Sequence, residues 1–175
     1  MIKIRPLDLE DYIAKTYHFA YITPGYYDLQ VNDMAFQFIY KAFDRPKACF
    51  FDDELVGEWL EHPILFGAFD NDQLLGFIEG SMEGWNQRFR ISNILLFEEA
   101  RNKHIGTSLM KHMILHAQQC HARMVILETQ SCNIPAIHFY KTLGFEIIGF
   151  DTCAYSNEDV EKHEVRIEMG LKLSM

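Results

Sequence analysis

The stretch FEEARNKHIGTSLMKHM, residues 97–113, changes from one kind of structure to another in its middle. The run RFRISNILLF that leads into it is apolar and rich in β-branched and aromatic residues, which is typical of a strand. From Ile105 onward apolar residues recur at helical spacing. Between the two lies a polar turn that carries Arg101, Lys103 and His104. The sequence therefore predicts a strand, a basic turn and a helix in direct succession.

This turn has two interpretations. The start of a helix offers unpaired N–H groups and the positive end of the helix dipole, so it attracts phosphate oxygens, and the basic residues add to that field. An ordinary connection with solvated Arg and Lys side chains has the same pattern. Neither GxGxxG nor GxxxxGK[ST] is present, which disfavours a Rossmann oxidoreductase and a nucleoside triphosphatase.

Length and composition limit the class of protein. The 175 residues, 49% hydrophobic and 14% aromatic, suit one globular domain, 1–175, without a low-complexity linker. No signal-like or membrane-spanning apolar run is present, so we expect a cytoplasmic protein that binds no membrane. Four cysteines without regular spacing are expected to be reduced. The net charge of −9 disfavours a nucleic-acid partner and is compatible with a cationic substrate.

Outward from the opening stretch, hydrophobic periodicity predicts an α/β (α+β) fold with a mixed sheet. Strands are expected at 2–6, 64–69, 73–82, 88–97, 123–130, 146–156 and 164–173. Helices are expected at 8–21, 32–43, 53–61, 105–117 and 133–145, the first capped by Asp8 and the last closed by Gly144.

The stretches on either side of the strand at 123–130 resemble the GNAT superfamily of acetyl-coenzyme A-dependent N-acetyltransferases. The frame RNKHIG at 101–106 is similar to that family's pyrophosphate turn, and NIPAIHFYKTLGF at 133–145 is similar to its following helix. The runs GWNQRFRISNI, LETQSCNIPAIHFY and FDTCAYS resemble the streptothricin acetyltransferase branch. The resemblance covers residues 64–150 best. It implies a single GNAT-like domain with a sheet splayed between two strands and helices on both faces.

In that frame residues 1–62 would form an N-terminal strand and acceptor-side helices, 64–150 the acetyl-CoA-binding core, and 151–175 the closing strands. The resemblance implies acetyl-CoA as cofactor, held by residues of the strand end, the turn and the next helix: Ile94, Leu95, Leu96, Arg101, Asn102, Lys103, His104, Ile105, Gly106, Thr107, Asn133 and Tyr140. His104 stands where the family usually has glycine, and we expect it to enter the left-handed region with its ring turned outward. Asn133 is equally interpretable as a helix N-cap.

The family's reaction is direct attack of an amine on the thioester, which needs no nucleophilic cysteine. Tyr140 matches the general-acid position, with an ordinary core tyrosine as the alternative. An alkyl amine is neutral in only about one molecule in 2,500 at pH 7, a deficit of about 4.6 kcal/mol that justifies a base. Glu128, at the end of an apolar strand where burial would raise its pKa, is the first candidate, and a structural carboxylate is the alternative. Ser92 and Asn93 replace the acidic residues usual in the branch, so Glu79 and Glu83 are substitute candidates.

Acceptor contacts are expected from aromatic and acidic residues outside the core motif, any of which equally suits packing: Tyr26, Tyr27, Glu79, Glu83, Trp85, Asn86, Asp151 and Tyr155. The pair His112 and His116 lacks a catalytic glutamate between its members, so no metal is expected. The predicted activity is acetylation of a primary amine on a small cationic molecule of streptothricin-like or polyamine type. Protein N-terminal or lysine acetylation, or coenzyme A binding without catalysis, are the alternatives. The sequence leaves open whether the chain forms a homodimer.

Overall fold

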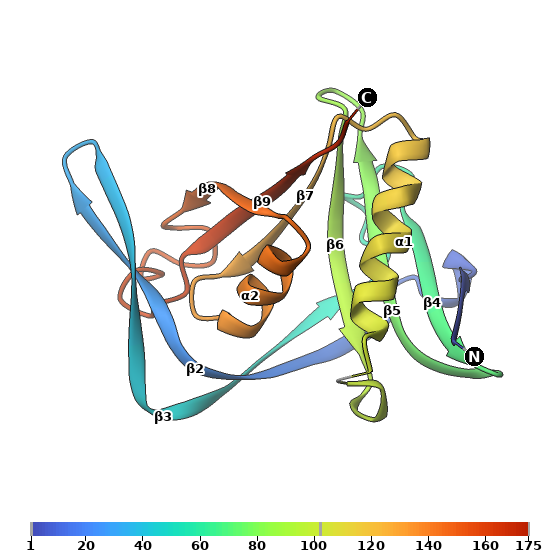
Figure 1. The fold of residues 1–175 in the computed structure, drawn as a ribbon, viewed down its shortest axis with the longest axis horizontal. Coiled ribbons are helices and arrows are strands. Elements are labelled where there is room, and N and C mark those ends of the chain that lie inside the picture. Colours follow the sequence, from blue (N-terminus) through green and yellow to red (C-terminus); the bar gives the residue numbers. More distant parts are fainter. Residues whose placement is uncertain (1, 102, 175) are drawn as a thin grey trace. The chain divides into compact units, whose positions relative to one another are not determined.

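The computed structural model describes residues 2–101 and 103–174, so the predicted contribution of Asn102 lies outside the described residues. Seven strands form a mixed sheet in the order β1-β4-β5-β6-β7-β9-β8, and two long strands form a second sheet, β2-β3 (Figure 1). The strands are β1 Ile2–Pro6, β2 Thr16–Asn32, β3 Ala35–Glu54, β4 Ile64–Asp70, β5 Gln73–Glu83, β6 Arg88–Leu96, β7 Met124–Gln130, β8 Glu146–Asp151 and β9 Arg166–Lys172. The helices are α1 Ile105–Gln119 and α2 Ile134–Thr142, with 3-10 turns η1 Leu9–Asp11 and η2 Glu98–Ala100.

The chain divides into two compact units that interleave in sequence. Unit 1 contains the residues up to His18, Asp52–Leu127 and the chain from Leu171 onward. Unit 2 contains Phe19–Phe51 and Glu128–Gly170. Neither unit coincides with the predicted segments 1–62, 64–150 and 151–175.

Unit 1 is built on an antiparallel meander with one helix packed against it. Strands β1, β4, β5 and β6 pair antiparallel in that spatial order, and α1 contacts β5, β4 and β6 (Figure 1). The predicted hairpin between 64–69 and 73–82 is confirmed as β4 and β5. Leu109, Met110 and Met113 of α1 have no exposed surface. The apolar residues whose spacing predicted this helix therefore form its buried face.

Strand β6 changes partner and register along its length. Its parallel ladder with β7 joins Arg88–Arg90 to Met124–Ile126, and both strands run on beyond these pairs, which is the splay expected. On its other side β6 pairs with β5 through a bulge, because Glu79 faces Asn93 whereas Gly80 faces Ile91. Ser92 is therefore the extra residue of the bulge.

Both helices end in the same way. In α2 the N–H of Gly144, which has φ 90°, donates to Lys141 O, and that of Phe145 donates to Tyr140 O. In α1 the N–H of His121, with φ 58°, donates to Gln118 O and that of Ala122 to Ala117 O. Each is a Schellman closure that needs a left-handed residue; glycine provides it without strain, as predicted for Gly144, and histidine at some cost.

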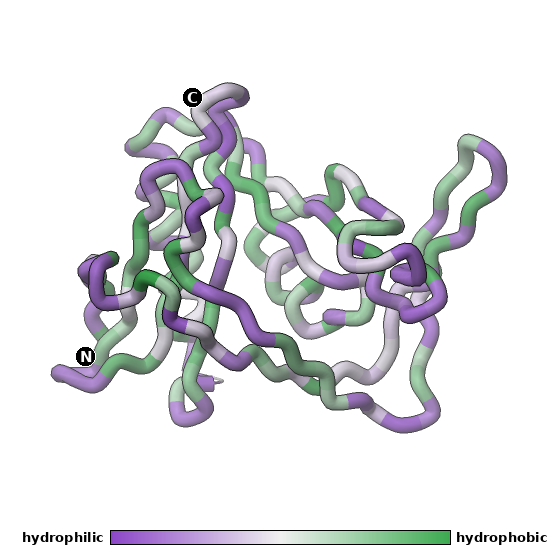
Figure 2. Tube along the Cα trace, turned by 180° about the vertical axis from the view of Figure 1, so that it is seen from behind, coloured by the Kyte–Doolittle hydropathy of each residue, from purple (hydrophilic) through white to green (hydrophobic). Residues whose placement is uncertain are grey.

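The predicted helices at 8–21, 32–43 and 53–61 are wrong. Asp8 accepts a hydrogen bond from Glu10 N, but only the short turn η1 follows, and residues 53–61 hold the end of β3 and a loop. Residues 16–54 form β2 and β3, a twisted ribbon that reverses at Asp33 (Figure 1). Ring pairs such as Tyr26–Phe43 and Tyr27–Tyr40 join its strands, and hydrophilic and hydrophobic residues are interspersed along it (Figure 2). Aromatic and β-branched content therefore outweighed a weak helical spacing.

Candidate functional site

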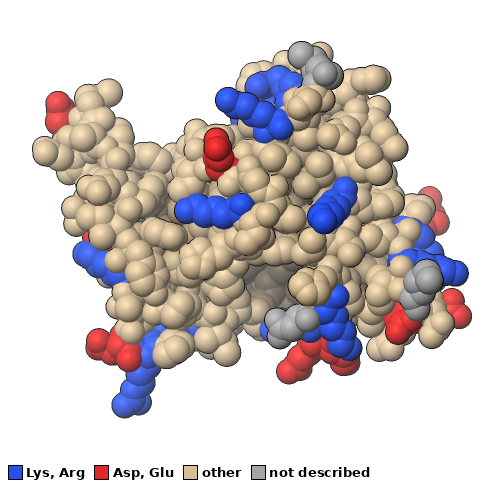
Figure 3. Space-filling model, viewed as in Figure 1, with Lys and Arg blue, Asp and Glu red and all other residues tan. Residues whose placement is uncertain are grey.

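The turn before α1 has the geometry of an anion-binding helix start. Ser108 N makes the first intrahelical hydrogen bond, 3.1 Å to His104 O, so the amides of residues 105–107 precede the helical ladder. No acidic residue lies in this first turn, and Arg101 and Lys103 are exposed just before it. Charged side chains of both signs gather at the foot of α1 in Figure 3. Together the amides and the two cations suit a phosphate group.

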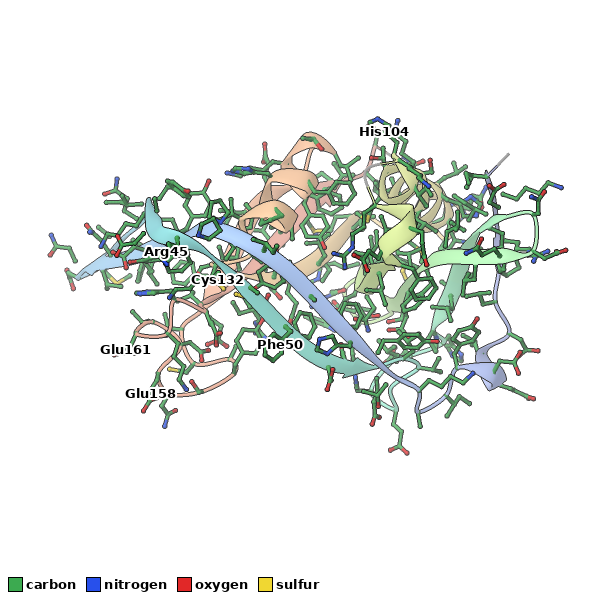
Figure 4. The ribbon with its side chains drawn as sticks, turned by 90° about the horizontal axis from the view of Figure 1, so that it is seen from below. Arg45, Phe50, His104, Cys132, Glu158 and Glu161 are labelled. Atoms are coloured by element: carbon green, nitrogen blue, oxygen red, sulfur yellow. The ribbon has the colours of Figure 1, made fainter. Side chains whose placement is uncertain are left out.

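His104 adopts the conformation expected of it. Its φ of 58° and ψ of 12° are left-handed, and its exposed side chain makes no capping hydrogen bond. Figure 4 shows the residue at the outer end of α1. A histidine therefore takes the backbone path for which glycine would be the unstrained choice.

The strand end that leads into this turn is only partly buried. Leu96, Leu95 and Ile94 pair with Gly76, Phe77 and Ile78 of β5, and Leu95 is buried whereas its two neighbours are half-buried. Phe97 N continues this edge by donating to Leu75 O. These residues thus connect β5 directly to the anion-binding turn.

Glu79 lies in the interior of unit 1. Its side chain has no exposed surface. Its Oε1 accepts from Val56 N at 2.6 Å, and its Oε2 accepts from Ser92 Oγ at 2.6 Å and from Asn93 Nδ2 at 3.1 Å. Full burial with three donors argues against both predicted roles of Glu79, acceptor contact and substitute base.

The hairpin between β5 and β6 holds Glu83, Trp85 and Asn86, whose acceptor roles stay predictions. Glu83 pairs with Arg88 and Arg90 and accepts a hydrogen bond from Asn86; although burial acts in the opposite direction, these partners hold its pKa below the usual value. Trp85 is 84% exposed at the tip. Ile94 comes six positions after Arg88 on β6, about 20 Å along a strand. The hairpin thus lies at the opposite end of β6 from the turn.

In unit 2, α2 positions Asn133 and Tyr140. Asn133 caps the helix, since its Oδ1 accepts from Ala136 N at 3.3 Å, so the N-cap interpretation is confirmed. Tyr140 is buried between the rings of Phe139 and Phe145, and burial raises its pKa to about 12. The hydroxyl therefore keeps its proton at neutral pH. The roles of both residues toward a cofactor stay predictions.

Glu128, Asp151 and Tyr155 do lie together in unit 2. Glu128, whose side chain is 38% exposed, lies 3.6 Å from Arg166, and Arg166 lies 3.4 Å from Asp151. Burial, and then the negative charge of Glu128, raises the pKa of Tyr155. Glu128 is therefore exposed and beside a guanidinium, which corrects the expectation that it is desolvated.

The two predicted aromatic acceptor residues on β2 both have partners. Tyr26 stacks on His163 with 3.7 Å between ring centroids. Tyr27 donates its N–H to Ser131 O, and the ammonium of Lys141 lies 5.5 Å from its ring. Both rings are half-buried, so they retain surface for a ligand as well as a packing role.

Sequence reasoning missed three features. Arg166 sits in a strand where alternation alone gave no reason to single it out. Asp159, fully buried, holds the loop before β9 by accepting from Tyr155 N and Ser156 Oγ, whereas Glu158 and Glu161 lie at the outer edge of that loop (Figure 4). A shallow depression in unit 1 is lined by acidic and aromatic side chains, among them Asp52, Asp53, Glu54, Glu58 and Trp59. Because a helix was predicted at 53–61, the sequence did not indicate that these acidic and aromatic side chains line one depression.

Among residues 2–101 and 103–174, no group of three or more His, Cys, Asp or Glu side chains is arranged to hold a metal ion. Within the same ranges no helix is long and apolar enough to cross a membrane. Cys49, Cys120, Cys132 and Cys153 are free thiols, and burial raises the pKa of Cys132 to about 11.

Known proteins resemble this chain in sequence and fold. It is 32% identical to streptothricin acetyltransferase of Streptomyces lavendulae over 119 residues, which cover 67% of this chain but only 63% of that protein. It is 24% identical to the Escherichia coli streptothricin acetyltransferase over 93% of this chain and 90% of that protein. A crystal structure of a Bacillus anthracis streptothricin acetyltransferase homologue in complex with acetyl coenzyme A is similar in fold, with a TM-score of 0.78 at 22% identity. The match covers 99% of this chain and 98% of that protein's chain, and it confirms the fold. Residues 26–145 match the model of the acetyltransferase (GNAT) family, to which the chain therefore belongs.

Proposed function

We propose that this protein transfers the acetyl group of acetyl-CoA to a primary amine of a small cationic molecule of streptothricin-like or polyamine type. Membership of the GNAT family makes it an acetyltransferase with acetyl-CoA as cofactor. The observation that carries the proposal is the start of α1, where three amides precede the helical ladder and the first turn holds no acidic residue. The relatives named streptothricin acetyltransferases support the acceptor class.

The donor set fits a pyrophosphate. Backbone amides of residues 105–107 are neutral donors at the positive end of a helix of 15 residues, and Arg101 and Lys103 supply countercharge. When bound, acetyl-CoA would supply a thioester as acyl donor. We assign the amides of Ile94 and Leu96 to its arm and carbonyl, a role in which preorganised donors contribute roughly 3–4 kcal/mol. N–H groups alternate along an antiparallel strand and Phe97 N donates to β5, so Leu95, two residues earlier, also turns its N–H towards β5. Asn133 would donate from its side-chain amide, because its Oδ1 already caps α2.

Two proton transfers complete the proposed reaction. The amine nitrogen bonds to the acetyl carbon, the carbon–sulfur bond breaks, and the thiolate takes a proton that Tyr140 gives from its hydroxyl. A pKa of about 12 keeps that proton in place until negative charge develops on sulfur. We assign removal of the amine proton to Glu128, which at 38% exposure is open to water. Asp151 and Tyr155, close to Arg166 and Glu128, and the rings of Tyr26 and Tyr27 are assigned to the acceptor.

A panel of acceptors tests the proposal. Thiol release from acetyl-CoA is followed with a streptothricin, a polyamine, an aminoglycoside and N-terminal peptides, each against a blank without amine. We expect release with a small cationic amine and little with peptides. Preference for peptides would favour protein acetylation, which relatives named N-alpha-acetyltransferase 30 motivate at 30% identity in Dictyostelium discoideum. Binding of acetyl-CoA without release to any amine would favour a non-catalytic role.

A further inference from the structure

We propose that Glu79 is a positioning residue that ties a strained turn at Val56 to the bulge of β6, and so fixes the strand end that approaches the thioester. This rests on the proposed function, because it assigns Glu79 to the same acetyl-transfer site. It replaces the two roles that the sequence suggested, acceptor contact and substitute base. The residues that carry it all belong to unit 1.

The buried side chain of Glu79 is satisfied by hydrogen bonds to both of its oxygens. A carboxylate with no exposed surface is tolerated only when donors satisfy it. Val56 N, Ser92 Oγ and Asn93 Nδ2 supply three such donors, at 2.6, 2.6 and 3.1 Å. They come from two segments, the loop after β3 and strand β6. Glu79 on β5 thus joins three parts of unit 1 at one point.

The hydrogen bond from Val56 N to Glu79 holds a strained backbone conformation. Val56 has φ 56°, and a β-branched residue in the left-handed region is strained. Such a conformation persists only where surrounding contacts impose it. The short hydrogen bond from Val56 N to Glu79, together with full burial of Leu55, provides that constraint. Glu79 therefore holds a conformation that Val56 would not keep without it.

Glu79 also holds the bulge of β6. Ser92 is the extra residue of β6, and its hydroxyl is held by Glu79 while Asn93 faces Glu79 across the ladder. Gly80 beside the bulge has no room for a side chain, since a Cβ there would lie 2.6 Å from the ring of Phe89 and 2.7 Å from Arg90 O. A bulge re-aims the strand that follows it. Here the strand that follows is Ile94–Leu96, so Glu79 acts on the thioester through the amides of Ile94 and Leu96.

Two substitutions at Glu79 separate positioning from acid–base chemistry. Glu79→Gln keeps an acceptor for Val56 N, and its amide can bond to Ser92 Oγ and to a flipped Asn93. Glu79→Leu has similar size but leaves three donors without an acceptor, Asn93 buried and Val56 and Ser92 part-buried. Ser92→Ala removes one donor only and serves as the mild variant if Glu79→Leu does not fold. Asp72→Asn, fully exposed on the β4–β5 turn, is the control for loss of one negative charge.

Three quantities are measured on each folded variant below its Tm: kcat with the best amine, Kd for acetyl-CoA by calorimetry, and amide hydrogen exchange. We expect Glu79→Gln to keep kcat within about threefold of wild type, whereas Glu79→Leu loses at least about tenfold. Amide hydrogen exchange at Val56 and at residues 93–96 should accelerate in Glu79→Leu, and to a smaller extent in Ser92→Ala. Exchange of the amides in α1 should stay unchanged in both variants.

Other outcomes overturn the inference. Equal losses of kcat in Glu79→Gln and Glu79→Leu with unchanged exchange would mean that the carboxylate takes part in chemistry. Wild-type kcat and exchange in Glu79→Leu, or in Ser92→Ala if that is the folded variant, would mean that Glu79 positions nothing. A wild-type protein without transfer to any amine would defeat the proposed function instead. In that case the exchange data alone decide whether Glu79 fixes the loop and the bulge.

Discussion

Replacing His104 by glycine tests how the turn before α1 is built. The residue holds φ 58° with an exposed ring that caps nothing, so the substitution removes strain and no contact. A left-handed conformation costs an ordinary residue roughly 1–2 kcal/mol, and glycine loses roughly 0.5–1 kcal/mol more entropy on folding. We therefore expect His104→Gly to stabilise the protein by about 0.7 kcal/mol, or about 2 °C in Tm for a chain of this size.

The functional part of this prediction is tighter binding of acetyl-CoA. Glycine lets the backbone approach a pyrophosphate more closely, and we expect Kd to fall by about threefold, or about 0.7 kcal/mol. His121→Gly is the matched control, since His121 has the same φ of 58° at the other end of α1. Calorimetry and thermal unfolding on both variants separate the two effects.

Both glycine variants should gain similar stability, and only His104→Gly should bind acetyl-CoA more tightly. Weaker or unchanged binding in His104→Gly would refute the assignment of this turn to the pyrophosphate. An equal gain of affinity in His121→Gly would refute it too, because a general stabilisation would then explain the effect.

Tyr140→Phe should lower kcat by about 10²-fold, with Kd for acetyl-CoA nearly unchanged. Because the pKa of Tyr140 is about 12, the wild-type rate should show no loss from Tyr140 ionisation below about pH 11. A kcat of the variant within twofold of wild type would assign the proton to another donor. Glu128→Gln should reduce kcat/KM by about tenfold or more at pH 7, and progressively less as pH rises and the amine arrives neutral; a pH profile of unchanged shape with a lower Tm would mean a structural role. Asp159→Asn should lower Tm at pH 7 by about 3 °C or more. Burial alone would raise the pKa of Asp159, but hydrogen bonds from the backbone and from Ser156 outweigh it and hold that pKa below its usual value. That stabilisation is present above the unfolded-state pKa and is lost as pH falls through the folded one, so the Tm difference should shrink in acid; a constant difference down to pH 3 would contradict it.

Sequence reasoning predicted well those elements in which the spacing of apolar or turn residues along the chain directly determines the packing. The apolar face of α1 is buried, and the hairpin of β4 and β5 follows its turn residues. The unusual conformation of His104 was predictable too, because the family pattern has glycine at that position.

The remaining elements depend on partners distant in the chain. Parts of residues 16–54, at 16–21 and 32–43, have spacing that suits a helix, yet cross-strand ring pairs such as Tyr26–Phe43 make the stretch a ribbon. Glu79 was predicted to face the acceptor, because no local pattern reveals that Val56 and Ser92 will surround it. Arg166 was missed for the same reason, since its two carboxylate neighbours come from β7 and β8.

The most direct test of acetyl-CoA binding at the start of α1 is a pair of calorimetric titrations. Thr107, half-buried in the first turn of α1, is replaced by Asp in one variant and by Asn in the other. The two side chains have nearly the same size and both suit a helix start, so they differ at the ligand chiefly in charge. We predict that Thr107→Asp binds acetyl-CoA at least about tenfold more weakly than Thr107→Asn, a gap that narrows as salt is raised. Equal affinities in the two folded variants would mean that the pyrophosphate lies elsewhere.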